Sequence, residues 1–534
     1  MTVDLGFPAD LTATIAAARR HGLGDLLTRT AARTPDRPAL VWRDHTDTFA
    51  DLDAVVNRTA NALASRGVTR GDRIAVFSHN CREFVVVHFA LAKLGAVSVP
   101  INFMLNAEEV AYILDHSGAS GVIAEDALEP VITPAIGARA MTVRGWIPLA
   151  RTVAPAGWDD VDTWFGHADA TAPDVLVGDD DPIQLMYTSG TESRPKGAVM
   201  TSRGLIQQYV GCIVDGGMTS DDVEAHALPF YHCAQLHCFL SVDVYLGATS
   251  IVLPGPDPAL ILATIERYGV TKLFCPPTVW IGLLRHPAFD STDLSSLRKG
   301  YYGASPMPAE VLRELAARLP DVSLWNFYGQ TEMAPLATIL QPHEQLTRIG
   351  SAGRPSLNVE TRIVDDDGRP VPAGTVGEIV HRSPQATAGY WNDVAKTAEA
   401  FQGGWFHSGD LGVMDADGYL AVVDRKKDMI KSGGENVASR EVEEAMFEHP
   451  AVAEVAVFGI PHDYWVEAVT AVVVPRPGAT VTREELLAHA RERLAGYKRP
   501  KFVELVEALP KNPSGKILKR DLRETFGHLG AERT

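Results

Sequence analysis

Residues 187–197 read Tyr187-Thr188-Ser189-Gly190-Thr191-Glu192-Ser193-Arg194-Pro195-Lys196-Gly197, and they follow an apolar run, Ile183 to Met186, that is typical of a buried strand. The glycines allow backbone N–H groups to turn toward an anion, the hydroxyls add donors, and Lys196 adds a positive charge. The stretch therefore predicts a loop that binds phosphate, although it does not match the Walker A pattern. Composition alone would favour an ordinary surface loop, so the assignment of this stretch as a phosphate-binding loop depends on other motifs elsewhere in the chain.

The chain on both sides of this loop alternates between helical and strand-like patterns. Residues 52–63 carry apolar side chains at helical spacing and stop at Gly67, and a helix is expected at 84–94 between strands at 74–77 and 97–101. The pattern resumes after the loop, with helices expected from about 205 and at 259–268 and strands at 250–253 and 272–275. Such alternation predicts parallel sheets that are covered by helices on both faces.

The pattern changes twice toward the C-terminus. Residues 353–419 contain short strand-like runs between Asp, Gly and Pro turns, which indicates a β-rich subdomain. After Asp424 the chain becomes basic and then glycine-rich, and the remainder has the pattern of a compact α+β unit. We therefore expect an α/β protein with a large N-terminal domain, residues 1–426, that holds two parallel-sheet α/β subdomains and the β-rich subdomain, followed by a small α+β domain, residues 427–534.

The bulk properties narrow the class of protein. The 534 residues can form more than one domain, and contents of 46% hydrophobic and 22% charged residues are ordinary for a soluble globular chain. The net charge of −18 argues against a general nucleic-acid-binding protein, although a few local cations can still bind an anionic substrate. The sequence shows no secretory signal and no apolar run long enough to cross a bilayer, so we expect a cytoplasmic protein.

The cysteines show neither a CxxC pair nor zinc-finger spacing, which predicts reduced, mostly buried thiols. Two of them flank His237 and lie near His232, but no second cluster completes a set of metal ligands, so core packing is the favoured interpretation. The cysteines are Cys81, Cys212, Cys233, Cys238 and Cys275.

Two further stretches are suited to bind the rest of a nucleotide. In Tyr328-Gly329-Gln330-Thr331-Glu332 an aromatic ring could lie on a base while the carboxylate holds Mg²⁺. In Ser408-Gly409-Asp410 a carboxylate at a glycine turn could accept hydrogen bonds from ribose hydroxyls. Each stretch taken alone is equally compatible with an ordinary turn.

Two basic stretches lie near the C-terminus. Residues 424–436 alternate opposite charges before Gly433 and Gly434, which suits either a flexible junction or an ordinary solvated linker. Residues 510–520 place Lys516 in a Pro/Ser/Gly turn, from which it could stabilise developing negative charge in a reaction. The alternative for this second stretch is a basic turn in the tail.

Taken together, in this order and at this spacing, these stretches closely resemble the adenylate-forming enzymes, which include acyl- and aryl-CoA synthetases, amino-acid adenylation domains and luciferases. The resemblance extends from near Leu26 to Arg520. It implies that the chain uses ATP and Mg²⁺ to make an acyl-AMP with release of pyrophosphate, and then transfers the acyl group to the thiol of coenzyme A. It also implies that the C-terminal domain is mobile and rotates about Lys427 between the two half-reactions.

The resemblance assigns candidate residues to ATP. Tyr328 would pack on adenine, Thr331 would reach the α-phosphate, and Asp410 with Arg425 would bind the ribose. The loop hydroxyls and Lys196 would hold the β- and γ-phosphates. The candidate ATP-binding residues are Thr188, Ser189, Gly190, Thr191, Lys196, Gly303, Ala304, Ser305, Tyr328, Gly329, Thr331, Asp410, Arg425 and Lys516, and the candidate Mg²⁺ ligands are Glu332 and Thr191.

Lys516 carries the main catalytic expectation. Attack by a carboxylate on an α-phosphate brings two anions together, and without a cation between them their repulsion in a dry site costs several kcal/mol. The resemblance implies that Lys516 bridges this pair, and that residues 431–436 replace it at the site for the second half-reaction. The candidate catalytic residues are Lys516, Glu332, Thr191, His232, Lys431 and Asn436.

The phosphate loop departs from the family pattern in one place. The usual loop continues with Thr-Gly after its Gly-Thr, whereas this chain has Glu192 and Ser193. A carboxylate beside a triphosphate is unfavourable unless it points to solvent or to the metal. We expect Glu192 to face outward, and we do not include Ser193 among the phosphate ligands.

The acid substrate is the least predictable part. His232 stands where amino-acid-activating members tend to carry an Asp, so we expect a carboxylate without an α-amine. The sequence as a whole resembles ligases of medium- and long-chain fatty acids, and hydroxycinnamate-type aryl acids remain an alternative substrate. A carrier-protein thiol remains an alternative acceptor. For the oligomeric state, a homodimer is the arrangement considered. A binding protein without catalysis is disfavoured by the joint presence of the candidate catalytic residues. The candidate pocket residues are Tyr231, Leu236, Trp280, Tyr302 and Trp325.

Overall fold

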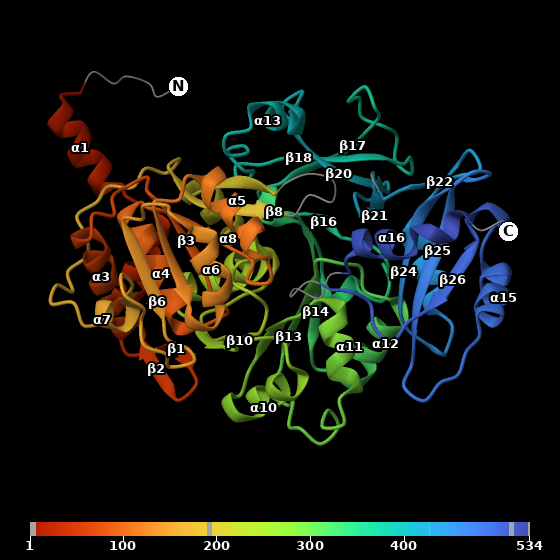
Figure 1. Ribbon diagram of the computed structural model, residues 1–534, viewed down its shortest axis with the longest axis horizontal. Helices are drawn as coiled ribbons and strands as arrows, with labels where there is room; N and C mark the ends of the chain where they lie inside the picture. The colour runs from red at the N-terminus through yellow and green to blue at the C-terminus, as the bar shows by residue number, and fades with distance from the viewer. Residues whose placement is uncertain (1–6, 189–194, 427, 512–516, 532–534) are drawn as a thin grey trace.

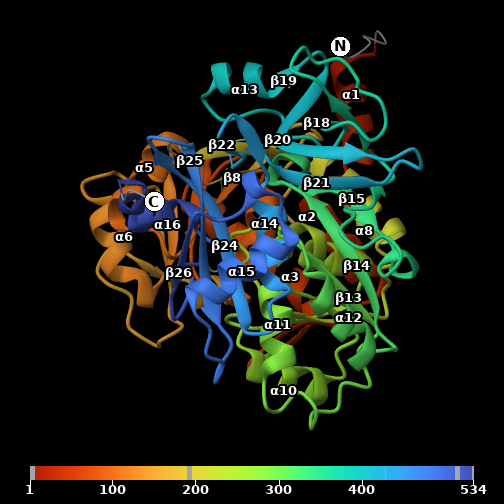
Figure 2. The ribbon, with the colours of Figure 1, turned by 90° about the vertical axis from the view of Figure 1, so that its right-hand side faces the viewer.

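The computed structural model describes residues 7–188, 195–426, 428–511 and 517–531 (Figure 1). The predicted site residues outside these ranges are Ser189, Gly190, Thr191, Lys427 and Lys516. Helix α1 lies at one end of the molecule and the C-terminal sheet at the other (Figure 1). Figure 2 looks onto the C-terminal end, where α14 and α15 face the viewer.

The first sheet has the strand order β7-β6-β5-β3-β4-β8-β9. Its neighbouring strands run parallel except for β8 and β9, which form an antiparallel pair. The bounds are β3 Arg73–Phe77, β4 Val97–Pro100, β5 Gly121–Glu125, β6 Val143–Ile147, β7 Asp159–Asp160, β8 Pro182–Thr188 and β9 Lys196–Thr201.

The second sheet has the order β16-β15-β14-β13-β12-β10-β11-β1-β2, with a parallel centre and antiparallel pairs at both edges. The bounds are β1 Pro38–Trp42, β2 His45–Thr48, β10 Val223–His226, β11 Thr249–Val252, β12 Lys272–Phe274, β13 Lys299–Gly303, β14 Ser323–Gly329, β15 Leu336–Leu340 and β16 Arg354–Pro355.

The remaining strands form one antiparallel sheet and the C-terminal sheet. The antiparallel sheet has the order β17-β18-β20-β19 with β21 on β20, and the C-terminal sheet has the order β23-β22-β25-β24 with β26 on β25. The bounds are β17 Glu360–Val364, β18 Gly377–Arg382, β19 Phe401–Gln402, β20 Trp405–Met414, β21 Leu420–Arg425, β22 Ile430–Ser432, β23 Glu435–Val437, β24 Val452–His462, β25 Val466–Pro475 and β26 Phe502–Leu505.

Several helices begin where the sequence supplies a side-chain cap. Thr48 accepts from the backbone N–H of Asp51 at the start of α3, and Thr482 forms the expected capping box with Glu485 at the start of α15. The bounds are α1 Ala9–Ala18, α2 Leu23–Arg33, α3 Phe49–Ser65, α4 Arg82–Leu94, α5 Ala107–Ser117, α6 Glu129–Ile136, α7 Val161–Phe165, α8 Ser202–Asp215, α9 Ser241–Leu246, α10 Pro258–Tyr268, α11 Pro277–Arg285, α12 Ala309–Arg318, α13 Val394–Ala400, α14 Ser439–Phe447, α15 Arg483–Arg493 and α16 Lys519–Phe526.

Helix α4 lies in a hydrophobic core to which both parallel sheets contribute. Every residue from Phe84 to Leu94 is buried, because this helix is apolar around most of its circumference and packs against α3 and α2 within the main hydrophobic cluster. The same cluster includes residues of both parallel sheets, such as Met186 in β8 and Phe274 in β12. The C-terminal unit has hydrophobic clusters of its own, built on β24 and β25. The predicted α/β class, with parallel sheets, a β-rich part and a small α+β unit, is confirmed.

Candidate active site

The β8–β9 hairpin sets the position of the phosphate-loop lysine. Thr188 pairs with Lys196, and Tyr187 pairs with Gly197, so both strands extend further than the apolar run Ile183 to Met186 indicated. Lys196 is therefore a strand residue and not part of a long loop. Its Nζ lies 5.1 Å from the centre of the Tyr390 ring, within cation–π range.

The turn after β14 carries the predicted metal ligand. A Cβ on Gly329 would lie 1.9 Å from the carbonyl oxygen of Pro335, so only glycine fits where the chain turns here. The turn continues into a short 3₁₀ helix, Thr331–Met333. Glu332 Oε1 accepts a hydrogen bond of 2.8 Å from the Tyr390 hydroxyl, and the carbonyl oxygen of Glu332 accepts one of 2.7 Å from the backbone N–H of Thr387.

The end of β13 lies beside this turn. A Cβ on Gly303 would lie 2.2 Å from the Phe327 carbonyl oxygen, because the two residues are paired across β13 and β14. Ala304 follows with a φ of 63°, in the left-handed region, and Ser305 is half-buried. Ligands of open α/β sheets bind at the carboxyl ends of parallel strands, and these predicted residues lie there.

The structure brings the predicted adenine and ribose residues together. The Tyr328 hydroxyl donates a 2.7 Å hydrogen bond to Asp410 Oδ2, and Arg425 Nε lies 3.5 Å from Asp410 Oδ1. Asp410 and Arg425 are paired residues on β20 and β21. Burial and the Asp410 carboxylate raise the pKa of Tyr328, so its hydroxyl remains a donor. That this group binds a nucleoside remains a prediction.

Residues 228–233, the histidine segment that carries His232, are hydrogen-bonded to Asn80 and to Thr331. Asn80 donates to the Leu228 carbonyl oxygen at 2.8 Å and accepts from the backbone N–H of Phe230 at 2.8 Å. One residue beyond His232, the Cys233 thiol donates to Thr331 Oγ1 at 3.3 Å. The histidine segment and the predicted α-phosphate contact are therefore neighbours.

Aromatic rings surround Tyr231 in this segment. Its ring centre lies 4.6 Å from that of His232 and 5.2 Å from that of Phe103, and Phe103 stacks on His79 at 3.9 Å. Tyr231 is 6% exposed, and its hydroxyl has no hydrogen-bond partner among the described residues. Burial raises the pKa of Tyr231, so the hydroxyl is neutral and can donate to a ligand.

The other predicted pocket residues are buried in the core. Trp280 Nε1 donates to the Tyr301 carbonyl oxygen at 3.1 Å, and the Tyr302 hydroxyl donates to Gln345 Oε1 at 2.6 Å. Leu236 and Trp325 belong to the main hydrophobic cluster. Their polar atoms and packing are accounted for within the fold, so a role in binding the acid stays a prediction for all of them.

The C-terminal candidates lie apart from this group. Lys431 and Asn436 face each other across the β22–β23 hairpin, whose turn uses Gly433 and Gly434 with φ of 62° and 87°. Both side chains are exposed, and the described contacts do not join them to the β8–β9 hairpin or to Glu332. At the junction, the backbone N–H of Ser439 donates to Asp424 Oδ2 at 2.6 Å.

Sequence reasoning missed the segment 385–391, which connects the predicted ATP residues. Tyr390 contacts both Lys196 and Glu332, and Thr387 bonds to the backbone of Glu332. Gln385, 2% exposed, donates to the carbonyl oxygens of Met333 and Leu336. The aromatic pair after Gly389 was the available signal, but nothing in its neighbours pointed to phosphate.

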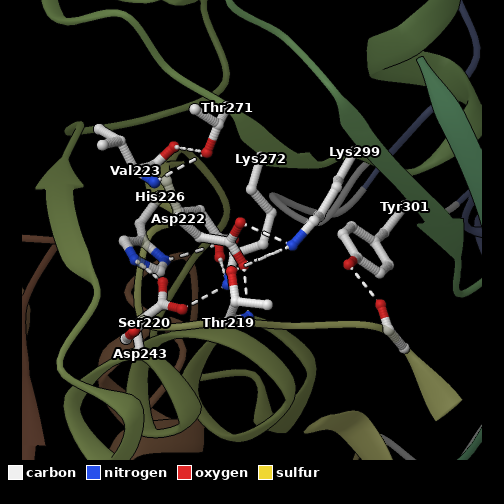
Figure 3. A network of polar contacts seen from close by, with 12 residues as sticks. Thr219, Ser220, Asp222, Val223, His226, Asp243, Thr271, Lys272, Lys299 and Tyr301 are labelled. Atoms are coloured by element: carbon white, nitrogen blue, oxygen red, sulfur yellow. Dashed lines mark hydrogen bonds and ion pairs between the residues drawn. The ribbon is translucent and has the colours of Figure 1, made fainter. Parts of the chain in front are cut away.

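A group of buried charges lies at β10, the strand that leads into the histidine segment (Figure 3). Lys272 Nζ lies 2.9 Å from Glu224 Oε2 and also pairs with Asp243 Oδ1, and His226 Nε2 lies 3.3 Å from Asp243 Oδ2. Within the described ranges, Glu224, His226 and Asp243 are the group whose donor atoms could hold a metal ion, but the Lys272 ammonium already pairs with both carboxylates. All cysteines are free and buried, in agreement with the predicted buried thiols, and none belongs to the possible metal-ligand group found among the described residues.

Comparisons with known proteins agree with this geometry. The family model "AMP-binding enzyme" matches residues 27–391, and the model "AMP-binding enzyme C-terminal domain" matches residues 441–516. A feruloyl-CoA synthase of Amycolatopsis sp. is 40% identical over 511 residues, covering 95% of this chain and 100% of its own. A long-chain-fatty-acid–CoA ligase of Mycobacterium tuberculosis is 36% identical over 482 residues, covering 90% and 93%.

Among solved structures, an anthranilate–CoA ligase in complex with anthranoyl-AMP superposes with a TM-score of 0.88. It is 29% identical, and the match covers 96% of this chain and 98% of that one. No helix in the described part of the chain is both long and apolar enough to span a membrane.

Proposed function

Since this chain belongs to the AMP-binding family of adenylate-forming enzymes, we propose that it activates an aryl carboxylic acid of the hydroxycinnamate type for transfer to coenzyme A. The chain is an acid–thiol ligase that uses ATP, Mg²⁺ and coenzyme A. The identity of the acid, the roles of individual residues and the domain rotation are the parts that we propose. A feruloyl-CoA synthase and an anthranilate–CoA ligase among the relatives support an aryl acid.

The observation that carries this proposal is the hydroxyl of Tyr231. A buried hydroxyl without a partner costs free energy unless a ligand or water completes it. Tyr231 adjoins His232 and Cys233, and Cys233 contacts the predicted α-phosphate residue Thr331. A ring oxygen on the acid would satisfy this hydroxyl, whereas an alkyl chain would not.

A fatty acid is the second candidate. The long-chain-fatty-acid–CoA ligase of Mycobacterium tuberculosis covers almost as much of this chain as the feruloyl-CoA synthase. An alkyl chain would pack well against Phe103 and the ring face of Tyr231. It would leave the tyrosine hydroxyl unpaired, which is why we place this candidate second.

In the first half-reaction, a carboxylate oxygen of the acid forms a bond to the α-phosphorus of ATP. The bond from that phosphorus to the bridging oxygen breaks, and pyrophosphate leaves. We propose that Lys196 holds the β- and γ-phosphates and that Lys516 neutralises the reacting pair. Tyr328, Asp410 and Arg425 would hold the nucleoside.

Glu332 fits the metal that this family requires. Tyr390 occupies one oxygen of the carboxylate, and no described residue bonds to the other, Oε2. Mg²⁺ prefers oxygen ligands of this kind and is often held by one or two carboxylates together with phosphates. Bound there, it would neutralise charge on the phosphates.

In the second half-reaction, the thiol sulfur of coenzyme A forms a bond to the acyl carbon. The bond from that carbon to the phosphate oxygen breaks, AMP leaves, and the thiol proton is released. We propose that the domain of residues 427–534 rotates about Lys427, so that residues 431–436 reach the site. A cavity of about 520 Å³ lies at the junction, between β21 and α14. The two domains are therefore not tightly packed against each other there, which supports the proposed rotation.

A panel of acids tests the aryl proposal. With pyrophosphate release as the readout, 4-hydroxycinnamate and ferulate should give a kcat/KM at least about ten-fold higher than octanoate or palmitate, because one satisfied buried hydroxyl is worth about 1–3 kcal/mol. In Tyr231→Phe, the preference for 4-hydroxycinnamate over unsubstituted cinnamate should shrink. A wild-type enzyme that prefers fatty acids would overturn the aryl assignment and favour the second candidate.

The acceptor thiol is tested separately. Enzyme-bound acyl-AMP, formed in a single turnover, should disappear on addition of coenzyme A. If it persists with coenzyme A and disappears only with a phosphopantetheinylated carrier protein, the chain loads a carrier protein instead.

Asp410→Asn should raise the KM for ATP about ten-fold, because it weakens a charge-assisted hydrogen bond to the ribose. The measurement compares KM for ATP with KM for 2′-deoxy-ATP, and we expect the difference between the two nucleotides to shrink in the variant. Asp417→Asn, which changes an exposed carboxylate in the turn after β20, serves as the control. An equal rise for both nucleotides would argue that Asp410 supports the fold and does not contact the ribose.

A further inference from the structure

Residues 385–391 form a strap across the candidate ATP site. The backbone N–H groups of Ala388 and Trp391 donate to the carbonyl oxygens of Val199 and Gly197 in β9, at 3.1 and 2.8 Å. Val199 in turn donates to the Gly389 carbonyl oxygen at 3.0 Å. One side of the strap is therefore paired with the strand that carries Lys196.

The other side of the strap is fixed to the turn that carries Glu332. The Thr387 N–H bonds to the Glu332 carbonyl oxygen at 2.7 Å, and the Thr387 hydroxyl donates back to Val199 at 2.8 Å. Gln385 adds hydrogen bonds to the carbonyl oxygens of the same turn. The strap thus holds two parts of the chain together that lie more than a hundred residues apart.

Tyr390 makes the side-chain contacts of this strap within the site. Its hydroxyl donates to Glu332 Oε1 at 2.8 Å, and its ring centre lies 5.1 Å from Lys196 Nζ. In this hydrogen bond the phenol hydroxyl is the donor and the carboxylate oxygen is the acceptor. One aromatic side chain therefore touches a cation and an anion of the same site.

We propose that Tyr390 is a positioning residue that sets the Glu332 carboxylate for Mg²⁺ through its hydroxyl and Lys196 for the phosphates through its ring. The proposal rests on the proposed function, since it assumes that this site binds MgATP. The hydroxyl occupies Oε1, so Oε2 is the oxygen presented to a metal ion. The ring lies within cation–π range of the Lys196 ammonium, which favours positions of this long side chain near the ring.

The two contacts can be separated by substitution. Tyr390→Phe removes the hydroxyl and keeps the ring, so it should affect the metal-dependent part of binding. Tyr390→Leu removes both contacts, so it should also weaken binding of the phosphates without metal. Tyr419→Phe is a matched control, because the Tyr419 hydroxyl also donates to a glutamate carboxylate, that of Glu344, outside this strap.

The test measures the Kd of a non-hydrolysable ATP analogue by equilibrium dialysis, once with Mg²⁺ and once with EDTA. We expect Tyr390→Phe to raise the Kd about ten-fold with Mg²⁺ and less than about two-fold with EDTA, the effect of one charge-assisted hydrogen bond. Tyr390→Leu should raise the Kd under both conditions, and Tyr419→Phe under neither. Thermal melting of each variant shows whether it is folded.

Two results would overturn the inference. If Tyr390→Phe raises the Kd equally with Mg²⁺ and with EDTA, the hydroxyl does not act through the metal site. If Tyr390→Phe binds the analogue as the wild type does, the contact with Glu332 has no role in positioning. A wild-type protein that does not bind the analogue at all would contradict the proposed function instead, which keeps the two failures distinct.

Discussion

Replacing Lys272 with methionine is expected to lower the free energy of unfolding by about 3–5 kcal/mol, the usual cost of removing one partner from a buried ion pair. Methionine has nearly the length of the lysine stem, so the change removes the charge with little change in volume. Urea unfolding followed by tryptophan fluorescence measures the effect as a shift in midpoint. A variant that unfolds within about 1 kcal/mol of the wild type would contradict this prediction.

The expected size follows from complete burial. Lys272, Glu224 and Asp243 are each 0% exposed, and the ammonium pairs with both carboxylates. Burial alone would lower the pKa of Lys272, but Asp243 and Glu224 raise it above its ordinary value, so the lysine is charged. The partners of a buried charge cannot be replaced by water without opening the core.

The two carboxylates are not equivalent, and this gives a matched control. Burial raises the pKa of Glu224 well above its ordinary value, although Lys272 lowers it, and this favours the neutral form of Glu224. Burial would also raise the pKa of Asp243, but Lys272 and His226 lower it below its ordinary value. Glu224→Gln should therefore change stability by less than about 1 kcal/mol, whereas Asp243→Asn should cost several kcal/mol. Equal losses would reverse this assignment of charge.

The buried charges around Lys272 also help to hold the segment that carries His232, through Gln235. Gln235, at the start of the π-helix Ala234–Leu240, lies with its Nε2 2.8 Å from His226 Nδ1, and its Oε1 accepts from the Leu228 N–H at 3.3 Å. Leu228, at the start of the histidine segment 228–233, is thus held both by Asn80 and by Gln235, which itself contacts His226 of this group. We expect the wild type to melt at the same temperature with and without EDTA, because Lys272, and not a metal, supplies the cation.

The sequence predicted the helices well where the signal lies within a few neighbouring residues. The apolar spacing of α3, the fully apolar α4 and the Thr482 capping box each depend on residues within one or two turns. The hairpin was less predictable, because the polar residues Thr188 and Lys196 belong to strands through their pairing with each other. Pairing across a loop leaves no periodic signal in either strand alone.

The site was predictable only through resemblance. Tyr328 lies 82 residues before Asp410 in the chain, and Tyr328, Asp410 and Arg425 each resembled an ordinary turn or linker residue, yet Tyr328 and Arg425 both contact Asp410. Tyr390 was missed because its role depends on the register of residues 388–391 against β9. The Lys272 group was missed for a similar reason, since a lysine that begins an apolar strand does not reveal that an aspartate 29 residues away faces it.

Lys516→Ala is expected to slow formation of acyl-AMP by about 10²–10³-fold, the usual effect of removing one preorganised group that stabilises charge in a transition state. The reason is electrostatic, because the carboxylate and the α-phosphate approach as two anions. The second half-reaction needs no such cation, so conversion of supplied acyl-AMP to acyl-CoA should stay within about three-fold of the wild type, well under the 1.4 kcal/mol that a ten-fold change represents. Pyrophosphate release and acyl-CoA formation from synthetic acyl-AMP measure the two steps separately.

The neighbouring lysine provides the control that makes this result specific. Lys511 precedes Lys516 in the chain and forms an isolated bridge with Ile517, and its Nζ lies 2.6 Å from Glu454 Oε2. It is therefore committed to an ion pair within the C-terminal domain, and Lys511→Ala should leave both half-reactions nearly unchanged. If the two alanine variants slow acyl-AMP formation equally, both lysines act through folding or docking of the domain. If Lys516→Ala slows both half-reactions equally, the lysine does not act on the adenylation step alone, and the assignment of separate residues to the two steps fails.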